Sequence, residues 1–225
     1  MTRSALLVGA TGLVGGQLLA RLLRNPLYDR VTVLARRPLS VSHPGLDARV
    51  VDFDALGPDD VPAVDDVYGA LGSTIRKAGS QETFRRIDQH YTVEVARLAR
   101  AAGARRLAVV SSQGANPASR AFYLRVKGDM EEQVAALGYP QVEIFRPSFI
   151  LGPREERRAG EKVGMVAASL LAPAMLGPVR PYRPVHAGRL ASAMITALTI
   201  RPEGEGTGVA ISTYDDFVRL TVPGE

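Results

Sequence analysis

Residues 5–16 read Ala-Leu-Leu-Val-Gly-Ala-Thr-Gly-Leu-Val-Gly-Gly, and this stretch decides the fold. The apolar run over residues 5–8 predicts a buried strand, and the amphipathic stretch 17–23 predicts a helix directly after it. Gly9 permits a tight turn, Gly12 lets a ligand approach the backbone, and Gly15 lets the helix pack closely on the strand. The N–H groups at such a helix start attract an anion such as a pyrophosphate. A plain glycine-rich turn is the alternative, but the position between strand and helix favours a dinucleotide-binding loop.

The rest of the chain alternates between strand-like and helix-like patterns. Short apolar runs predict further strands at residues 31–35, 48–53, 66–70, 106–111 and 141–145. Helices are predicted over residues 79–102, where apolar residues recur three and four apart, and over 118–137, where Gly138 follows. This alternation predicts an α/β fold, a Rossmann-type doubly wound parallel sheet with helices on both faces.

The last third of the chain shows less regular hydrophobic periodicity. Residues 154–162 read as a charged loop, 163–171 and 187–199 as helices, and 208–211 as a weak strand. Because this piece is too short for an independent domain of much stability, we expect residues 1–225 to form one dinucleotide-binding domain. Residues 148–225 would contribute a small lid that shapes the substrate pocket.

Composition narrows the classes of function. The 225 residues are 46% hydrophobic and include no cysteine, which suits a reducing, cytoplasmic location. The histidines, His43, His90 and His186, are far apart, so no metal site is expected. The net charge of +5 is spread out and no tryptophan is present, so nucleic acid is not an expected partner. The uncharged stretch 163–179 is short and interrupted by proline, so no integral membrane segment is expected. Residues 1–4 lead straight into the first predicted strand, so no cleavable signal is expected.

Two arginines follow the predicted strand 31–35. A carboxylate at this place would bind the ribose 2′-hydroxyl of NAD, whereas Arg36 and Arg37 suit a 2′-phosphate in charge and geometry. The sequence therefore predicts NADP(H) as the preferred cofactor, with NAD(H) as the alternative. A solvated strand exit is the plainer interpretation of the same two residues.

Candidate contacts gather at the carboxyl ends of the predicted strands, where ligands bind in such folds. Asp52 and Phe53 could flank an adenine ring, although an ordinary acidic turn explains them equally well. The small residues after Leu71 and Gly72 let backbone lie beside a cofactor. Expected contacts from these ends are Gly9, Thr11, Gly12, Leu13, Val14, Gly15, Arg36, Arg37, Asp52, Phe53, Leu71, Gly72, Ser111, Arg146 and Pro147.

Tyr123 and Lys127 lie four residues apart on the predicted helix 118–137, so they share a face. An ammonium beside a phenol favours the phenolate, and such a tyrosine can give a proton to a carbonyl oxygen or take one from an alcohol. A hydroxyl from the preceding strand end, Ser112 or Ser111, could bind the same oxygen. A chance surface pair is the alternative, but the position after a Ser-Ser strand end favours a catalytic set.

These motifs resemble those of the short-chain dehydrogenases/reductases, in particular the atypical, extended-like group, over nearly the whole chain. Gly9 to Gly15 is similar to the Gly-x-x-Gly-x-x-Gly loop of that group, and Tyr123 to Lys127 to its Tyr-x-x-x-Lys motif. The resemblance implies that Tyr123 is the acid/base, that Lys127 tunes it and binds the nicotinamide ribose, and that Ser112 orients the substrate oxygen. The stretch Arg146-Pro147-Ser148 resembles the segment beside the nicotinamide in extended members, which adds Ser148 to the expected contacts.

A closer resemblance is to the Tat-interacting-protein-like subgroup of oxidoreductases. The stretch 71–79, the residues 84–91 and the run 123–128 followed by Asp129 look like its signature. One residue departs from the wider family: Asp88 stands where many members place an asparagine of a proton relay. The subgroup also includes members reported in binding and regulatory roles, so the fold alone does not imply turnover.

Three hypotheses of function result. The first is an NADP(H)-dependent oxidoreductase that reduces a carbonyl or oxidises a secondary alcohol of a small-molecule substrate, as a monomer or homodimer. The second is an NADP(H)-binding sensor or scaffold with little catalysis, and the third is a nucleotide-sugar epimerase or dehydratase. His186 precedes the predicted helix 187–199, and it could contact substrate or be an ordinary loop or helix-cap histidine.

Overall fold

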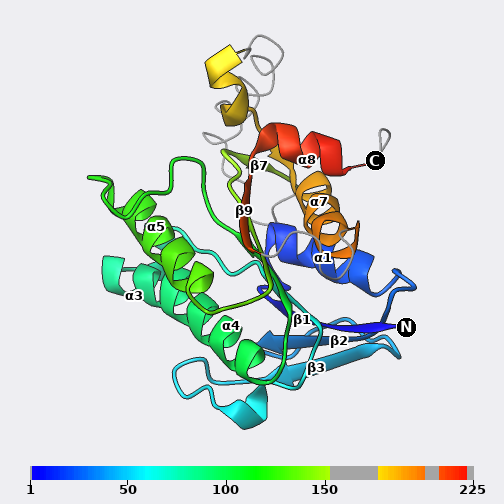
Figure 1. Cartoon of the computed structure of the whole chain (residues 1–225). Coiled ribbons are helices and arrows are strands. Elements are labelled where there is room, and N and C mark those ends of the chain that lie inside the picture. The colour runs from blue at the N-terminus through cyan, green and yellow to red at the C-terminus, as the bar shows by residue number, and fades with distance from the viewer. Residues whose placement is uncertain (1, 153–176, 201–207, 222–225) are drawn as a thin grey trace.

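Seven parallel strands form the main sheet of the computed structural model, which describes residues 2–152, 177–200 and 208–221 (Figure 1). The strand order is β3-β2-β1-β4-β5-β6-β9. In chain order the strands are β1 (Arg3–Val8), β2 (Tyr28–Ala35), β3 (Leu46–Val50), β4 (Asp66–Gly69), β5 (Arg106–Val110), β6 (Gln141–Phe145) and β9 (Gly208–Ser212). The predicted α/β, Rossmann-type doubly wound parallel sheet is confirmed.

Helices cover both faces of the sheet (Figure 1). One face carries α1 (Leu13–Leu22), α7 (Ala187–Ile200) and α8 (Tyr214–Leu220). The other carries α3 (Gln81–Arg85), α4 (Tyr91–Ala101) and α5 (Phe122–Ala135). Shorter elements are η1 (Pro58–Asp60), α2 (Ile75–Ala78), the π-helical turn η2 (Arg86–His90), η4 (Gly177–Tyr182) and a separate strand pair, β7 (Ile150–Leu151) with β8 (Val185–His186).

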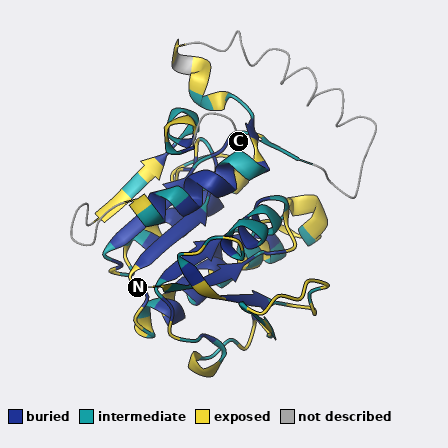
Figure 2. Ribbon diagram, turned by 90° about the vertical axis from the view of Figure 1, so that its right-hand side faces the viewer, coloured by how far each residue is buried: buried dark blue, intermediate teal, exposed yellow. Residues whose placement is uncertain are grey.

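The core has one half on each face, because successive strand side chains point to opposite faces. In β1, Ala5 and Leu7 pack toward α1 and α7, while Leu6 and Val8 pack toward α4 and α5. The central strands and most of α7 are buried, as the dark blue ribbon of Figure 2 shows. A sheet buried on both faces explains why its strands read as continuous apolar runs rather than alternating ones.

Several predicted boundaries differ from the observed ones. The expected helix 79–102 is three elements, α3, η2 and α4. The helix expected from 118 begins at Phe122, because Asn116 turns the chain by accepting the N–H groups of Ala118 and Ser119. The third strand ends at Val50 rather than at 53, because the Asp52 carboxylate accepts the Asp54 N–H in a turn. The predicted loop 154–162 and helix 163–171 lie outside the described residues.

The described part of residues 148–225 returns to the main sheet. Helix α7 packs on α1, where the Arg21 Nε donates to the Ser192 hydroxyl at 2.9 Å. Strand β9 extends the sheet beyond β6, and α8 follows it. A lid role within 148–225 therefore stays a prediction that concerns only the chain outside α7, β9 and α8.

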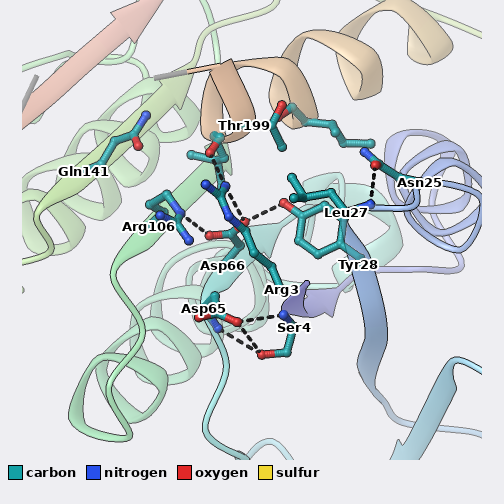
Figure 3. Close-up of polar contacts among 12 residues, drawn as sticks. Arg3, Ser4, Asn25, Leu27, Tyr28, Asp65, Asp66, Arg106, Gln141 and Thr199 are labelled. Atoms are coloured by element: carbon teal, nitrogen blue, oxygen red, sulfur yellow. Dashed lines mark hydrogen bonds and ion pairs between the residues drawn. The ribbon is translucent and has the colours of Figure 1, made fainter. Parts of the chain in front are cut away.

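A buried charge cluster lies at the amino ends of the central strands (Figure 3). The sheet register places Asp66 beside Arg106, and the two form an ion pair with Asp66 fully buried. The Tyr28 hydroxyl donates to Asp66 at 2.5 Å, and burial, together with the nearby Asp66 charge, raises the pKa of Tyr28 so that this proton stays. Arg3 approaches the same carboxylate at 3.7 Å and donates to the Leu198 carbonyl of α7 at 3.0 Å. The cluster thus joins four strands, β1, β2, β4 and β5, to the end of a helix.

Candidate functional site

The glycine loop after β1 is built so tightly that two of its glycines have no room for a side chain. Gly9 has φ +85°, and a Cβ there would lie 2.3 Å from the Ala70 carbonyl oxygen. A Cβ on Gly15 would lie 2.0 Å from the Gly9 carbonyl oxygen. At Gly12 the nearest atom to a Cβ is 3.2 Å away, and the residue itself is exposed. Gly9 and Gly15 are therefore required by packing, and the exposed Gly12 backbone stays the predicted place of ligand approach.

The Gly15→Ala variant should have a free energy of unfolding about 2–3 kcal/mol lower than the unaltered protein. The new Cβ would meet backbone atoms, which cannot move away as a side chain can. Gly16→Ala is the matched control on the same helix. Its Cβ would meet only the Ala10 carbonyl oxygen at 3.5 Å, an ordinary contact. Its stability should change by less than about 1 kcal/mol, in the stabilising direction that alanine has in helices. Urea unfolding of both variants measures the difference, and equal midpoints would contradict this account of the loop.

The start of α1 fits an anion. Gly12 caps the helix without a side-chain hydrogen bond, and the first turn holds no acidic residue. Thr11 and Gly12 are exposed there, and Val14 is buried beneath. Helix N–H groups without a side-chain cap, together with the positive end of the helix dipole, suit a pyrophosphate. The residues present therefore fit the phosphate part of a dinucleotide.

The two arginines after β2 are exposed at the carboxyl end of the strand. Within the described ranges, neither Arg36 nor Arg37 forms a hydrogen bond or an ion pair with protein. The Phe53 ring is buried, and it packs on Tyr91 with 5.3 Å between the ring centroids. The exposed side chain at this place is that of Asp52, and the expected cofactor contacts of Asp52 and Phe53 stay predictions.

Lys127 and Asp88 form a buried ion pair beneath the candidate catalytic tyrosine. The Lys127 Nζ lies 2.7 Å from the Asp88 Oδ1, and the two residues are 3% and 1% exposed. The other carboxylate oxygen of Asp88 accepts the N–H of Ser73, just after Leu71 and Gly72, at 2.8 Å. Burial by itself lowers the pKa of Lys127, but the Asp88 carboxylate and Tyr123 outweigh it and the pKa is raised. Lys127 is therefore a buried ammonium.

Tyr123 lies one turn before Lys127 on α5. It is 37% exposed, and its ring packs on Phe84 at 5.6 Å between centroids. A Cβ on Gly128 would lie 2.2 Å from the Pro117 nitrogen, so α5 touches the loop that follows β5. The same loop is tied to the first turn of α5 by the hydrogen bond from Asn116 N to the Leu124 carbonyl.

The serines at the end of β5 begin that loop. The Ser112 carbonyl accepts the N–H of Ala115, so Ser112 is fixed to the part of the loop that contacts α5. Ser112 is buried, and its hydroxyl is only weakly engaged, at 3.4 Å from the Gln113 carbonyl. The Ser111 hydroxyl is also buried and has no hydrogen-bond partner among the described residues. The structure thus brings Ser111 and Ser112 to the loop beside the helix that carries Tyr123.

The segment after β6 has its polar groups already engaged. The Arg146 guanidinium holds the buried Glu131 of α5 through two nitrogens. The Pro147 carbonyl accepts the Gln113 N–H at 2.9 Å, and the Ser148 hydroxyl donates to the carbonyls of Tyr182 and Arg183. Arg146, Pro147 and Ser148, the three predicted contacts, therefore connect β6 with η4 and with the loop that begins at Ser111 and Ser112, which we call the serine loop. His186 is exposed at the end of β8.

Sequence reasoning did not predict the ion pair of Asp88 with Lys127 or that of Glu131 with Arg146. For Glu131 the sequence carried no signal, because its partner Arg146 comes from the end of β6. Asp88 was recognised as a departure from the family, but its partner depends on the π-helical turn η2, which no periodicity predicted. In the described part of the chain no group of three or more potential metal ligands occurs.

The glycine loop and the open start of α1 fit an NAD(P)-binding protein, and comparisons with known proteins agree. A family model described as NAD(P)H-binding matches residues 9–144, more than half of the sequence. The chain therefore belongs to the NAD(P)H-binding family, and Protein HTATIP2 is among its relatives. The predicted family and subgroup are confirmed.

Relatives and solved structures support the same placement. Protein HTATIP2 of Rattus norvegicus is 36% identical over 165 residues, 71% of this chain and 67% of that protein. Protein FMP52, mitochondrial, of Coccidioides immitis is 34% identical over 233 residues, 95% of this chain and 94% of that protein. The structure of MoeE5 in complex with UDP-glucose and NAD has a TM-score of 0.68 at 18% identity, covering 96% of this chain and 80% of that one. At that identity the likeness shows the fold alone.

No helix among the described residues is long and apolar enough to cross a membrane. Several relatives carry "mitochondrial" in their names, so the expected cytoplasmic location stays a prediction.

Proposed function

We propose that the protein is an NADP(H)-dependent oxidoreductase that interconverts a carbonyl and a secondary alcohol on a small molecule. The observation that carries the proposal is the buried Lys127 ammonium one turn from the half-exposed Tyr123, on a helix that packs against the serine loop. In this arrangement Tyr123 exchanges a proton with the substrate oxygen, and the Ser112 hydroxyl donates a hydrogen bond to the same oxygen. Lys127 supplies a fixed positive charge one turn from Tyr123 on the same helix.

The cofactor has a matching set of residues on this chain. The glycine loop and the open start of α1 would hold the pyrophosphate, and Arg36 with Arg37 would hold a 2′-phosphate. The buried Ser111 hydroxyl, which lacks a partner among the described residues, offers a further polar contact. When bound, the nicotinamide supplies or accepts the hydride.

Arg36→Ala should raise the Kd for NADPH by about 10- to 100-fold and leave that for NADH nearly unchanged, because one charge-assisted pair with phosphate is lost. Arg30→Ala is the control, since Arg30 is an exposed arginine of the same strand, β2, near its opposite end. Fluorescence titration with NADPH and with NADH gives the Kd for each cofactor in both variants and in the unaltered protein. An equal loss for NADPH and NADH in Arg36→Ala would refute a 2′-phosphate contact.

Turnover itself is tested with the unaltered protein, NADPH and a panel of aldehydes and ketones. Oxidation of NADPH that depends on both protein and carbonyl supports the proposal. Tight NADPH binding with no oxidation across the panel favours the second candidate, an NADP(H)-binding sensor or scaffold. The observation behind that candidate is the Asp88–Lys127 pair, which already engages the lysine that the reaction requires.

A further inference from the structure

Gln113 follows Ser112 in the serine loop, and the proposed mechanism gives it no role. Its side-chain oxygen Oε1 is buried, and it has no hydrogen-bond partner within the part of the chain that the structure describes. Most buried polar atoms in folded proteins are hydrogen-bonded, so an unpaired buried acceptor calls for an explanation. Such an atom lowers stability, because it has given up its hydrogen bonds to water without a replacement.

Backbone contacts hold Gln113 between the end of β5 and the first turn of α5. Its N–H donates to the Pro147 carbonyl at 2.9 Å, which extends the pairing of β5 with β6. The next residue, Gly114, packs on α5, since a Cβ there would lie 3.5 Å from the Leu124 Cδ1. Leu124 is the neighbour of Tyr123. Gln113 therefore lies between the serine proposed to bind the substrate oxygen and the helical turn that carries Tyr123.

Gln141, at the start of β6, shows how this chain engages a buried glutamine that serves the fold. Its Nε2 donates to the Glu143 carboxylate and to the Ala197 carbonyl of α7, both at 3.0 Å. The Oε1 of Gln113 has no comparable bond in the described ranges. Because Gln113 lies at the carboxyl end of β5, where doubly wound sheets bind ligands, we expect its missing partner to be a group of the ligand.

The chemistry of the site narrows what that group is. The partner of Oε1 has to be a hydrogen-bond donor, because an amide oxygen only accepts. A ligand ammonium would need a counter-charge, and the buried Asp88 carboxylate is already paired with Lys127. A hydroxyl group is uncharged and donates without a counter-charge. Since Gln113 directly follows Ser112, which is proposed to bind the reacting oxygen, we expect this hydroxyl on the carbon next to the reacting carbon.

We infer that Gln113 recognises a hydroxyl group beside the reacting carbonyl, so that the substrates are α-hydroxy ketones or aldehydes and the products are vicinal diols. The inference rests on the proposed function, because it assumes that Ser112 and Tyr123 hold the reacting oxygen. In the reduction, the carbonyl carbon gains the hydride of NADPH and the oxygen gains the Tyr123 proton, which yields the diol and NADP⁺. The phenolate left behind regains a proton from solvent. The recognised hydroxyl donates a hydrogen bond to the Gln113 Oε1 and is itself unchanged.

A matched pair of small ketones tests this recognition without turnover. Hydroxyacetone and 2-butanone differ only in a hydroxyl that takes the place of a methyl group. Each ketone is titrated into the NADPH complex of Tyr123→Phe, and the NADPH fluorescence gives its Kd. Hydroxyacetone should bind about 10- to 100-fold more tightly than 2-butanone, because only its hydroxyl satisfies the buried acceptor.

Adding Gln113→Met to the Tyr123→Phe protein should reduce this preference to about 2-fold or less, because methionine keeps the length of the side chain and lacks the acceptor. Equal Kd values of the two ketones in Tyr123→Phe would overturn the inference. So would an absence of hydroxyacetone binding, or a preference that survives Gln113→Met.

Unfolding separates a role in recognition from a role in the fold. Gln113→Met removes an unpaired acceptor, so its urea midpoint should equal or exceed that of the unaltered protein. Gln141→Met is the control, because it breaks two hydrogen bonds of a buried amide and should lower the midpoint. A midpoint for Gln113→Met as low as that of Gln141→Met would show that the Gln113 amide is engaged in the fold, and the inference would fail.

Kinetics distinguish a failure of this inference from a failure of the proposed function. With NADPH, kcat/KM for hydroxyacetone should exceed that for 2-butanone about 10- to 100-fold, and the ratio should approach one in Gln113→Met. Gln133→Met changes an exposed glutamine of α5 in the same way and should keep the ratio. Reduction of both ketones with equal efficiency would refute the inference alone. No NADPH oxidation with any carbonyl would refute the proposed function, and the two Kd values would still decide the inference.

Discussion

Tyr123→Phe is expected to lower kcat for carbonyl reduction by about 100- to 10,000-fold, the range that loss of a positioned proton donor costs. The substitution removes only the hydroxyl, and the ring keeps its packing on Phe84. The Kd for NADPH and the unfolding temperature should therefore stay close to those of the unaltered protein. Stopped-flow single turnovers would measure the chemical step itself, free of product release.

The matched control is Tyr214→Phe, which removes a tyrosine hydroxyl on α8 and keeps the ring that lies under Arg183. It should not alter kcat. A Tyr123→Phe protein that reduces carbonyls at the rate of this control would show that the proton comes from another group. In that case Ser112, whose hydroxyl is only weakly engaged, would be the first to examine.

Asp66→Ala is expected to lower the free energy of unfolding by about 3–5 kcal/mol, because it removes the carboxylate from a buried ion pair and leaves its cation inside. Arg106 is as buried as its partner, and the Tyr28 hydroxyl would lose its acceptor as well. The loss should appear as a lower urea midpoint with an unchanged slope. The catalytic parameters of the folded protein should persist, since the cluster lies at the ends of the strands away from the glycine loop.

Asp47→Ala is the control for that result. Asp47 pairs with Arg49 at 2.9 Å, but both side chains are about one-third exposed, and exposed pairs contribute only about 0–1 kcal/mol. A similar small loss in Asp66→Ala would mean that the cluster is hydrated or rearranges. A hydrophobic replacement of the whole cluster would then be the informative next variant.

Much of the fold could be predicted from the sequence, because the strands are buried runs and the helices carry apolar stripes. Strands β1, β4, β5 and β6 lie where the apolar runs are. What escaped prediction was set by single hydrogen bonds or by contacts distant in sequence. Strand β3 stops where the Asp52 side chain turns the chain, and β7 with β8 exists because residues 35 positions apart pair. The helix α8 is too short for its periodicity to stand out.

The residues of the candidate site could be predicted from the sequence, but the ion pairs between them could not. Motif spacing pointed to the glycine loop, the serines at the end of β5, and Tyr123 with Lys127. It could not show that Lys127 is buried against Asp88, or that Arg146 is bound to Glu131, because each pair joins two different elements through tertiary packing. The buried cluster around Asp66 was missed for the same reason. A lone Asp at a strand start is unremarkable until the register sets an arginine beside it.

The π-helical turn η2 has a consequence for insertions and deletions in this chain. A π turn holds one residue more than an α turn, so deleting one residue from 86–90 would let α3 and α4 run as one regular helix. That change would rotate everything on one side of the deletion by about 100° relative to the other. Either the apolar stripe of α4 or the carboxylate that faces Lys127 would then point the wrong way. The locally less favourable turn is thus what lets one helical stretch serve both the core and the site, and a length change there would be harder to accommodate than most substitutions.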